Sequence, residues 1–146
     1  MCVEQSDPTD IRATRATMHV LPYLMFPGTC RDALDFYAAA LGGTIEHIQT
    51  VGESPLPAPP EHADRVFNSV FVAGRLRFMA SDGEPGNDPS VGHNFAMFVS
   101  CPDAEKQQEV FAAMADGGRV LIPLNNGFGM LEDRFEIRWM IALKTG

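Results

Sequence analysis

The stretch FYAAALGGTIEHI (residues 36–48) is repeated in pattern by VFAAMADGGRVLIPL (residues 110–124). Each combines the end of an alanine-rich helix, two consecutive glycines and a run rich in β-branched residues. Gly42 aligns with Gly117, and Phe36 with Phe111, at the same offset of 75 residues (117 less 42, 111 less 36). The chain therefore carries one structural unit twice.

Working outward from these stretches, the hydrophobic periodicity and the turn residues predict the order βαβββ, followed by βαβββ again. The elements expected in the first unit are a strand over 18–26, a helix over 28–43, a strand over 44–51 and a hairpin over 65–82 that turns at Ala73-Gly74. The elements expected in the second unit are a strand over 93–101, a helix over 102–118, a strand over 119–124 and two strands within 130–143.

This order predicts an α+β protein with four segments along the chain. We expect a flexible, Thr-rich tail over residues 1–17, a first module over 18–82, a linker over 83–92 and a second module over 93–146. A single βαβββ module leaves one face of its sheet in water, whereas two modules can curve their sheets around a shared cavity. Concave apolar cavities between repeats are typical sites for small ligands.

Details within the first module refine this expectation. Pro22 indicates either that the first strand lies at a sheet edge or that the strand is irregular there. Thr29 is the expected N-cap of the helix. The proline-rich loop over residues 52–64 is expected to be stiff and extended. Trp139, in the last strand, is expected to pack under a helix in the core.

The composition limits the partners of the protein. The 146 residues carry a formal net charge of −8, which excludes a basic nucleic-acid footprint and disfavours an anionic membrane surface. The N-terminus lacks the apolar core of a signal peptide, and no apolar run reaches the ~20 residues of a membrane span. We therefore expect a cytoplasmic protein whose three cysteines are idle thiols, with a catalytic Cys30 as a minor alternative.

Four segments give the chain a family resemblance. PYLMFPGTCRDALDFYAAALGG (22–43), LRFMASD (76–82), GHNFAMFVSCPDAEKQQEVFAAMADGGRVLIPL (92–124) and LEDRFEIRWMIAL (131–143) resemble the PhnB-like branch of the vicinal oxygen chelate superfamily. The resemblance implies the glyoxalase/bleomycin resistance fold and a homodimer. Members of this branch often carry the label of a demethylubiquinone methyltransferase. The sequence offers no Gly-rich loop after a strand for S-adenosylmethionine, so that activity is not expected.

The resemblance also implies where a metal would bind. Catalytic members of the superfamily hold a divalent ion with His, Gln or Glu from four inward strand positions, which here are Pro22, Met79, Asn94 and Met140. Proline has no donor atom, and thioethers suit hard, oxygen-seeking ions poorly. We therefore expect no metal and no other cofactor. His93, beside Asn94, offers an alternative ligand if the strand register differs by one residue.

The same register predicts the wall of the cavity. The residues expected to bind a small-molecule ligand are Leu24, Phe26, Arg77, Met79, Ser81, Asn94, Phe98, Arg138 and Met140. This wall is apolar and rich in methionine, which adapts to irregular shapes. Arg77 and Arg138 could face an anionic ligand or could pair with Glu136 or Asp133. The same residues also suit a filled core.

No catalytic residue is expected. Asp82 could act as a general base, but an aspartate before glycine more often begins a turn. The leading hypothesis is therefore a metal-free protein that binds a small, partly apolar molecule in the inter-module cavity. The alternatives are a metal-dependent lyase or isomerase with an unusual ligand set around His93, and a dimerising scaffold without a ligand.

Only NNGFG (125–129) separates the sixth and seventh strands, where PhnB-like proteins carry a longer aromatic stretch.

Overall fold

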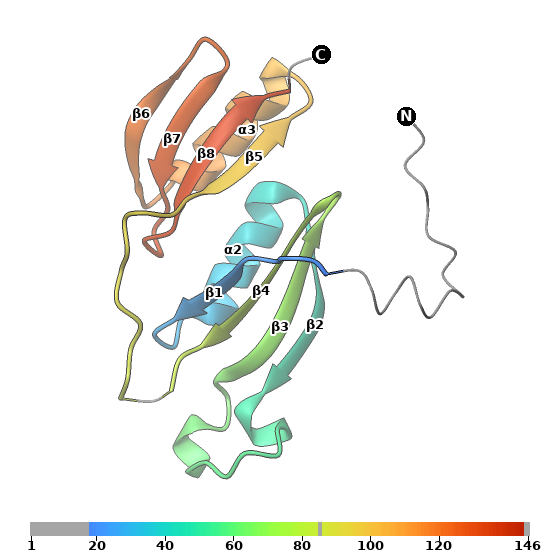
Figure 1. Ribbon diagram of the computed structural model, residues 1–146, viewed down its shortest axis with the longest axis vertical. Helices are drawn as coiled ribbons and strands as arrows, with labels where there is room; N and C mark the ends of the chain where they lie inside the picture. Colours follow the sequence, from blue (N-terminus) through green and yellow to red (C-terminus); the bar gives the residue numbers. More distant parts are fainter. Residues whose placement is uncertain (1–17, 85, 145–146) are drawn as a thin grey trace, which may run out of the picture.

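The computed structural model describes residues 18–84 and 86–144, so the expected tail over residues 1–17 lies outside the described residues. Two βαβββ modules follow each other along the chain, as the sequence predicts (Figure 1). The first consists of β1 (Tyr23–Phe26), α2 (Cys30–Leu41), β2 (Thr44–Thr50), β3 (Val66–Ala73) and β4 (Leu76–Asp82). The second consists of β5 (Met97–Cys101), α3 (Ala104–Ala115), β6 (Arg119–Asn125), β7 (Phe128–Glu132) and β8 (Arg138–Leu143).

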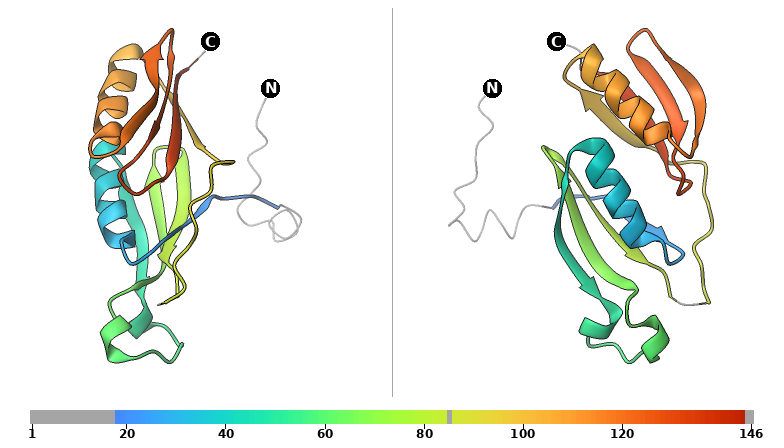
Figure 2. Two further views of the ribbon diagram at one scale, coloured as in Figure 1. Left: turned by 90° about the vertical axis from the view of Figure 1, so that its left-hand side faces the viewer. Right: turned by 180° about the vertical axis from the view of Figure 1, so that it is seen from behind.

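Each module forms its own four-stranded sheet, and the two sheets share one topology. The strand orders are β1-β4-β3-β2 and β5-β8-β7-β6, with the first pair of each order parallel and the other pairs antiparallel. The expected edge position of the strand after Pro22 is confirmed, since β1 borders the first sheet. Both helices lie on one side of the molecule and both sheets on the other (Figure 2). Each sheet therefore has one face covered by a helix and one open face.

The paired glycines end the helices and admit the neighbouring strands. Gly42 and Gly117 adopt φ values of 71° and 79°, a left-handed conformation that glycine adopts without steric cost. A Cβ added to Gly43 would lie 2.6 Å from the carbonyl oxygen of Val72, and one on Gly118 would lie 2.1 Å from that of Glu132. The first glycine of each pair reverses the chain, and the second lets two backbones approach.

The amino-terminal end of α2 is capped from far along the chain. Thr29 occupies the N-cap position, as expected, but its side chain makes no capping hydrogen bond. Instead the carboxylate of Asp82 accepts hydrogen bonds from the backbone N–H groups of Cys30 (2.9 Å) and Val66 (2.8 Å). Asp82 thus joins the ends of β4 and α2, which is a structural task.

Two further local expectations are corrected. The β3–β4 hairpin turns at Gly74-Arg75, one residue later than expected, because Ala73 still pairs with Leu76. The proline-rich loop is not fully extended. It contains two short 3₁₀ turns, η1 (Val51–Glu53) and η2 (Pro60–His62), and Thr50 and Glu53 form a reciprocal capping box at the first.

The register decides which side chains enter the core. Leu24 and Phe26 are only 6% and 1% exposed and belong to the hydrophobic core under the helices. The expectation that they face the cavity is therefore wrong by one residue, since Tyr23 and Met25 lie on the opposite, open face. In the second module Trp139 is fully buried in the core, as predicted.

A buried polar cluster joins the two modules. Asp133, in the loop between β7 and β8, accepts hydrogen bonds from the Tyr37 hydroxyl of α2 at 2.6 Å and from the Trp139 indole at 2.9 Å. Its other oxygen accepts the backbone N–H groups of Phe135 (2.8 Å) and Ile137 (3.1 Å). Burial raises the pKa of Asp133, an effect that these donors oppose, and burial next to this carboxyl raises the pKa of Tyr37 well above its ordinary value.

Aromatic packing surrounds this polar cluster. The Phe135 ring meets Phe26, Phe36 and Tyr37 edge-on, with centroid separations of 6.0, 5.7 and 6.2 Å. The β7–β8 loop of the second module is thereby inserted against α2 and β1 of the first. This junction fixes the modules side by side.

Candidate functional site

An open groove of about 790 Å³ lies between the modules. It lies where the tip of the β3–β4 hairpin and the end of α2 face β5 and the start of α3. Its volume falls within the roughly 300–1,000 Å³ range of small-molecule sites. The apolar part of its wall includes Leu41, Leu76, Phe95, Phe98, Val110 and Trp139.

Unequal loop lengths explain why the groove is open. At the filled junction the β7–β8 loop spans residues 133–137 and inserts Phe135 against α2. The corresponding β3–β4 turn consists of only Gly74 and Arg75, so no aromatic side chain is available there to pack against α3. The shorter turn leaves the space between the modules unfilled.

A second hollow is smaller, about 210 Å³, and lies along the linker before β5. Its wall includes Leu24, Met25, Phe95, Phe135 and Arg138. That volume lies below the usual range for a small-molecule site, so the larger groove is the better candidate.

The structure separates the nine residues predicted to bind a ligand. Arg77 and Phe98 line the large groove. The remaining seven lie elsewhere: Met79, Ser81, Arg138 and Met140 on the open sheet faces, Leu24 and Phe26 in the core, and Asn94 exposed in the linker before β5. The single shared wall of the sequence interpretation is therefore divided between a groove and two open faces.

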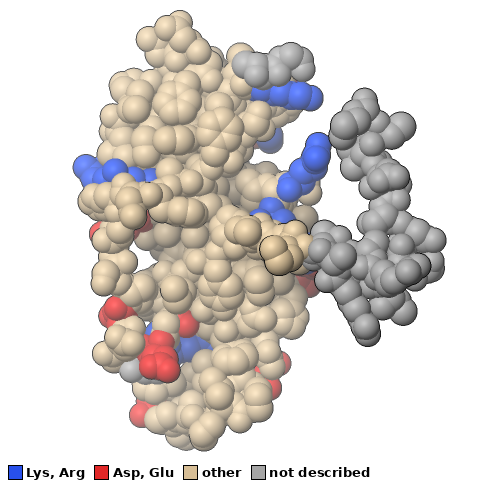
Figure 3. Space-filling view, in the orientation of Figure 1, with Lys and Arg blue, Asp and Glu red and all other residues tan. Residues whose placement is uncertain are grey.

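The open faces carry matching apolar rows. In the first sheet the cross-strand row is Tyr23–Met79–Val70, which ends at the polar His47, and in the second it is Phe98–Met140–Met130–Ile122. Tyr23, Phe98 and Ile122 are 44%, 63% and 45% exposed, although apolar side chains of this size are usually buried. Figure 3 views this side of the molecule, and uncharged residues cover most of it.

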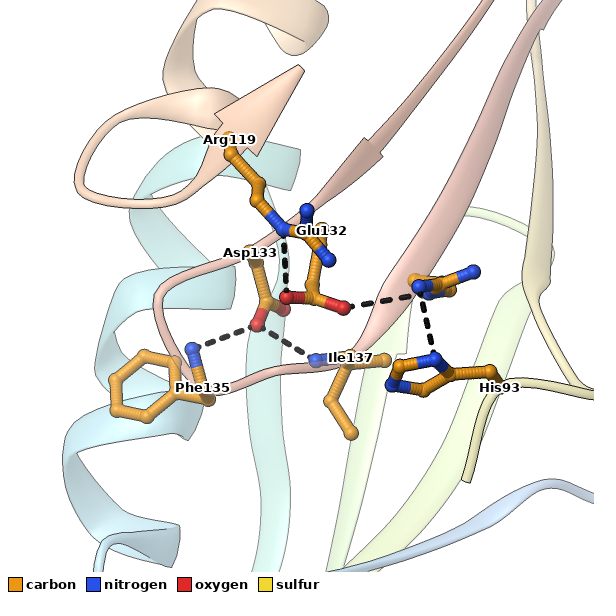
Figure 4. Close-up of polar contacts among 7 residues, drawn as sticks. His93, Arg119, Glu132, Asp133, Phe135 and Ile137 are labelled. Atoms are coloured by element: carbon orange, nitrogen blue, oxygen red, sulfur yellow. Dashed lines mark hydrogen bonds and ion pairs between the residues drawn. The ribbon is translucent and has the colours of Figure 1, made fainter. Parts of the chain in front are cut away.

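A charged cluster borders the row of the second sheet. The carboxylate of Glu132 on β7 accepts hydrogen bonds from the Nε atoms of Arg119 (3.1 Å) and Arg138 (3.3 Å). Figure 4 shows this carboxylate between Arg119 and His93. The hydrogen bonds from the two guanidinium groups lower the pKa of Glu132, that from Arg119 most strongly. The expected pairing of Arg138 with Glu136 or Asp133 is wrong; its carboxylate partner is Glu132.

His93 completes this cluster from the segment just before β5. Its Nδ1 lies 3.2 Å from a terminal nitrogen of Arg138. Because a guanidinium can only donate, Nδ1 accepts this hydrogen bond and the proton of the neutral ring belongs on Nε2. The contact joins the segment before β5 to β8.

The residues at the superfamily's metal positions do not fit a catalytic metal. Met79 and Met140 lie on the open faces of different sheets, Asn94 lies outside any strand, and Pro22 offers only its backbone oxygen, which accepts from Met79 N–H at 2.9 Å. Within residues 18–84 and 86–144 no group of three or more His, Cys, Asp or Glu side chains could hold an ion. No step of a reaction can be derived through a metal held by these side chains.

Neither strand–helix junction is arranged as a phosphate-binding site. An anionic cofactor group at such a junction would need free backbone N–H groups at the start of a helix. At α2 the Cys30 N–H is already bound by Asp82, and at α3 the Asp103 side chain accepts the Lys106 N–H at 2.7 Å. The side chains that cap these helices occupy the places an anionic group would take.

Cys30 is unsuited to nucleophilic chemistry. Its side chain is fully buried, and burial raises the pKa of the thiol to about 12. The thiolate that would attack a substrate is therefore almost absent at neutral pH. Cys101 is also buried, and burial raises its pKa too.

Sequence reasoning missed three basic residues of the groove: Arg75, Lys106 and Lys144. They come from the β3–β4 turn, the first turn of α3 and the residue after β8. The repeat itself offered one signal, because a hairpin tip that meets the other module's helix in one half should do so in the other. No local pattern shows that these charges converge.

No helix in the described part of the chain is long and apolar enough to cross a membrane.

The fold has solved counterparts. The crystal structure of protein PA1353 from Pseudomonas aeruginosa matches with a TM-score of 0.80 and 32% identity, over 89% of this chain and 100% of that one. The PhnB protein of Bacillus cereus matches with a TM-score of 0.70 and 23% identity, over 87% and 100% of the two chains. The fosfomycin resistance protein FosX from Listeria monocytogenes, at 8% identity and a TM-score of 0.60 over 88% and 93%, shares the fold.

Sequence comparison agrees with the structural comparison. Protein YjdN of Escherichia coli is 27% identical over 140 residues, which cover 85% of this chain and 94% of YjdN. Residues 18–142 match the family described as 3-demethylubiquinone-9 3-methyltransferase. The chain therefore belongs to this family, the PhnB-like branch of the vicinal oxygen chelate superfamily.

Proposed function

We propose that this protein binds a small, partly apolar molecule in the groove between its modules without a metal ion. The observation that carries the proposal is the groove itself, about 790 Å³ in volume and walled largely by apolar side chains. Phe98 is 63% exposed at its edge, and covering such surface with a ligand is favourable by about 25 cal/mol per Å².

The chemistry of the chain favours binding over catalysis. The described cysteines are buried, Asp82 is engaged as a helix cap, and Glu132 is held by two arginines. None of these groups is a free acid, base or nucleophile at the groove. The family's description names a methyltransferase, but the capped helices described above do not support carrying that activity over.

We also propose that two copies of the chain pair through their open sheet faces. The exposed apolar rows support this, because a second copy would remove Tyr23, Met25 and Ile122 from water.

The free, buried thiols of Cys30 and Cys101 fit a reducing compartment, and we propose that the protein is cytoplasmic.

Native mass spectrometry with elemental analysis of the purified full-length protein tests the binding proposal. We expect a bound small organic molecule and no stoichiometric zinc, nickel, iron or manganese. Ser100→Phe, which places a ring at the groove wall, should abolish the bound mass. Ala39→Phe, on the exposed side of α2 and outside the groove lining, is the matched control and should keep it.

Three outcomes would overturn the proposal. A metal held in stoichiometric amount would favour the enzymatic alternative. A bound molecule that survives Ser100→Phe unchanged would place the ligand elsewhere. If neither an ion nor an organic molecule is found and Ser100→Phe changes no added ligand's affinity, the scaffold alternative stands.

A further inference from the structure

The ionised side chains that line the groove are all basic. They are Arg75, Arg77, Lys106 and Lys144, and no aspartate or glutamate is part of the wall. Lys106 and Lys144 are the two lysines of a chain that has 19 acidic residues and a net charge of −8. Against that composition, four cations and no carboxylate around one hollow are a local reversal of charge.

These cations come from three separate segments that the fold brings together. Figure 3 shows blue side chains gathered along the right-hand edge of the molecule, with no red side chain among them on that face. The same edge holds the β3–β4 tip and the carboxyl-terminal end of β8 (Figure 1). The cations therefore form a positive rim around the apolar wall.

The charges of the rim are only partly neutralised by the protein. Arg77 pairs with Glu46 at 3.2 Å and Lys106 with Glu109 at 3.7 Å, in exposed pairs of the kind that contribute little. For Arg75 and Lys144 no ion pair occurs within residues 18–84 and 86–144. By contrast, Arg138 on the open sheet face is held by Glu132 at 3.3 Å. The rim retains positive charge that a ligand could meet.

We infer that the ligand of this groove is an amphipathic organic anion: an apolar or aromatic body carrying a carboxylate, sulfonate or phosphate group. The inference rests on the proposed function, since it specifies the chemistry of a molecule bound in the same groove. The apolar body lies against Leu76 and Phe98, and the anionic group lies at the rim near Arg75 and Lys144. The basic rim attracts the anion, and the apolar wall retains the body.

A matched pair of fluorescent probes tests the inference. 8-Anilinonaphthalene-1-sulfonate and N-phenyl-1-naphthylamine share their aromatic rings and differ in the sulfonate group. On the full-length protein we expect the sulfonate to bind at least about tenfold more tightly and to lose affinity as salt is raised. Loss of probe binding in Ser100→Phe places the bound probe at the groove.

Variants separate charge from shape. Arg75→Gln and Lys144→Gln should each weaken binding of the sulfonate about two- to fivefold and leave the neutral probe unchanged. Arg31→Gln, on the exposed side of α2 and outside the groove lining, changes the net charge equally and should change neither affinity. Octanoate should displace the bound sulfonate, whereas inorganic phosphate at the same concentration should not.

The outcomes distinguish the inference from the function on which it rests. If both probes bind equally, are insensitive to the two charge variants and are lost in Ser100→Phe, the groove binds apolar molecules and the anion inference is wrong. If Ser100→Phe leaves both probes bound, the proposed function itself fails. Displacement by inorganic phosphate as strong as that by octanoate would overturn the requirement for an apolar body.

Discussion

The hydrogen bond between Tyr37 and Asp133 should determine how firmly the two modules hold together. Tyr37→Phe removes one oxygen atom and keeps the aromatic packing with Phe78 and Phe135. The lost bond is 2.6 Å long, and Tyr37 and Asp133 are 0% and 2% exposed, so water cannot replace it without a rearrangement. A hydrogen bond to a charged group contributes about 1.5–3 kcal/mol, so we expect that loss of stability and a Tm lower by about 5–10 °C.

The assay is urea unfolding at pH 7, followed by Trp139 fluorescence for the junction between the modules and by far-ultraviolet circular dichroism for the whole fold. Tyr23→Phe, on the half-exposed open face, is the matched control and should change stability by less than about 0.5 kcal/mol. In the wild type the two probes should give coincident transitions. They should separate in Tyr37→Phe if the bond couples the modules.

The pH dependence gives an independent readout. Burial raises the pKa of Asp133, and the Tyr37 hydroxyl opposes that rise. Tyr37→Phe should therefore raise the pKa of Asp133 in the folded protein further above its value in the unfolded protein. The stability difference between variant and wild type is then largest where Asp133 is ionised in both, and it shrinks as pH falls through the raised pKa. A difference from the control below about 0.5 kcal/mol, or one that is constant from pH 4 to 8, would refute the reasoning.

Three further outcomes follow from the structure. The pKa of the Cys30 thiol is about 12 in the folded protein, so iodoacetamide at pH 8 should modify this thiol only after unfolding in urea. The free energy of unfolding should fall as pH rises above the ordinary thiol pKa of 9.0, because only the unfolded thiol then ionises. Rapid modification of Cys30 in the native protein, located by peptide mass spectrometry, would contradict this. Gly118→Ala should destabilise the second module by more than about 2 kcal/mol in urea unfolding, since the added Cβ would meet the Glu132 carbonyl oxygen. Gly74→Ala has open space around it and should lower the free energy of unfolding by only about 1 kcal/mol, because of its positive φ. Equal losses of stability would show that close backbone approach is not the cause. Light scattering should give a dimer for the wild type and a monomer for Ile122→Glu, with Ala39→Glu on α2 as the control that stays dimeric, and a monomeric wild type would end the pairing proposal.

Strand facing shows where sequence interpretation failed. Tyr23, Leu24, Met25 and Phe26 are all apolar, so the sequence has no alternation from which to tell the core face from the open face. The structure places Leu24 and Phe26 under α2 and leaves Tyr23 and Met25 outside. Packing against the neighbouring strand and the helix determines which side chains of β1 face the core, and a shift of the strand by one residue reverses that facing.

The sequence by itself determined the duplicated βαβββ order and the sites where the helices end. Those features depend on local chemistry: glycines that accept a left-handed backbone, hydrophobic periodicity and turn residues. Tertiary structure alone decided the cap on α2, whose Asp82 lies 52 residues from Cys30, and the junction between Tyr37 and Asp133, 96 residues apart. It also brought the four cations of the groove together. Such contacts depend on how distant segments pack, and a linear pattern records only what each segment does alone.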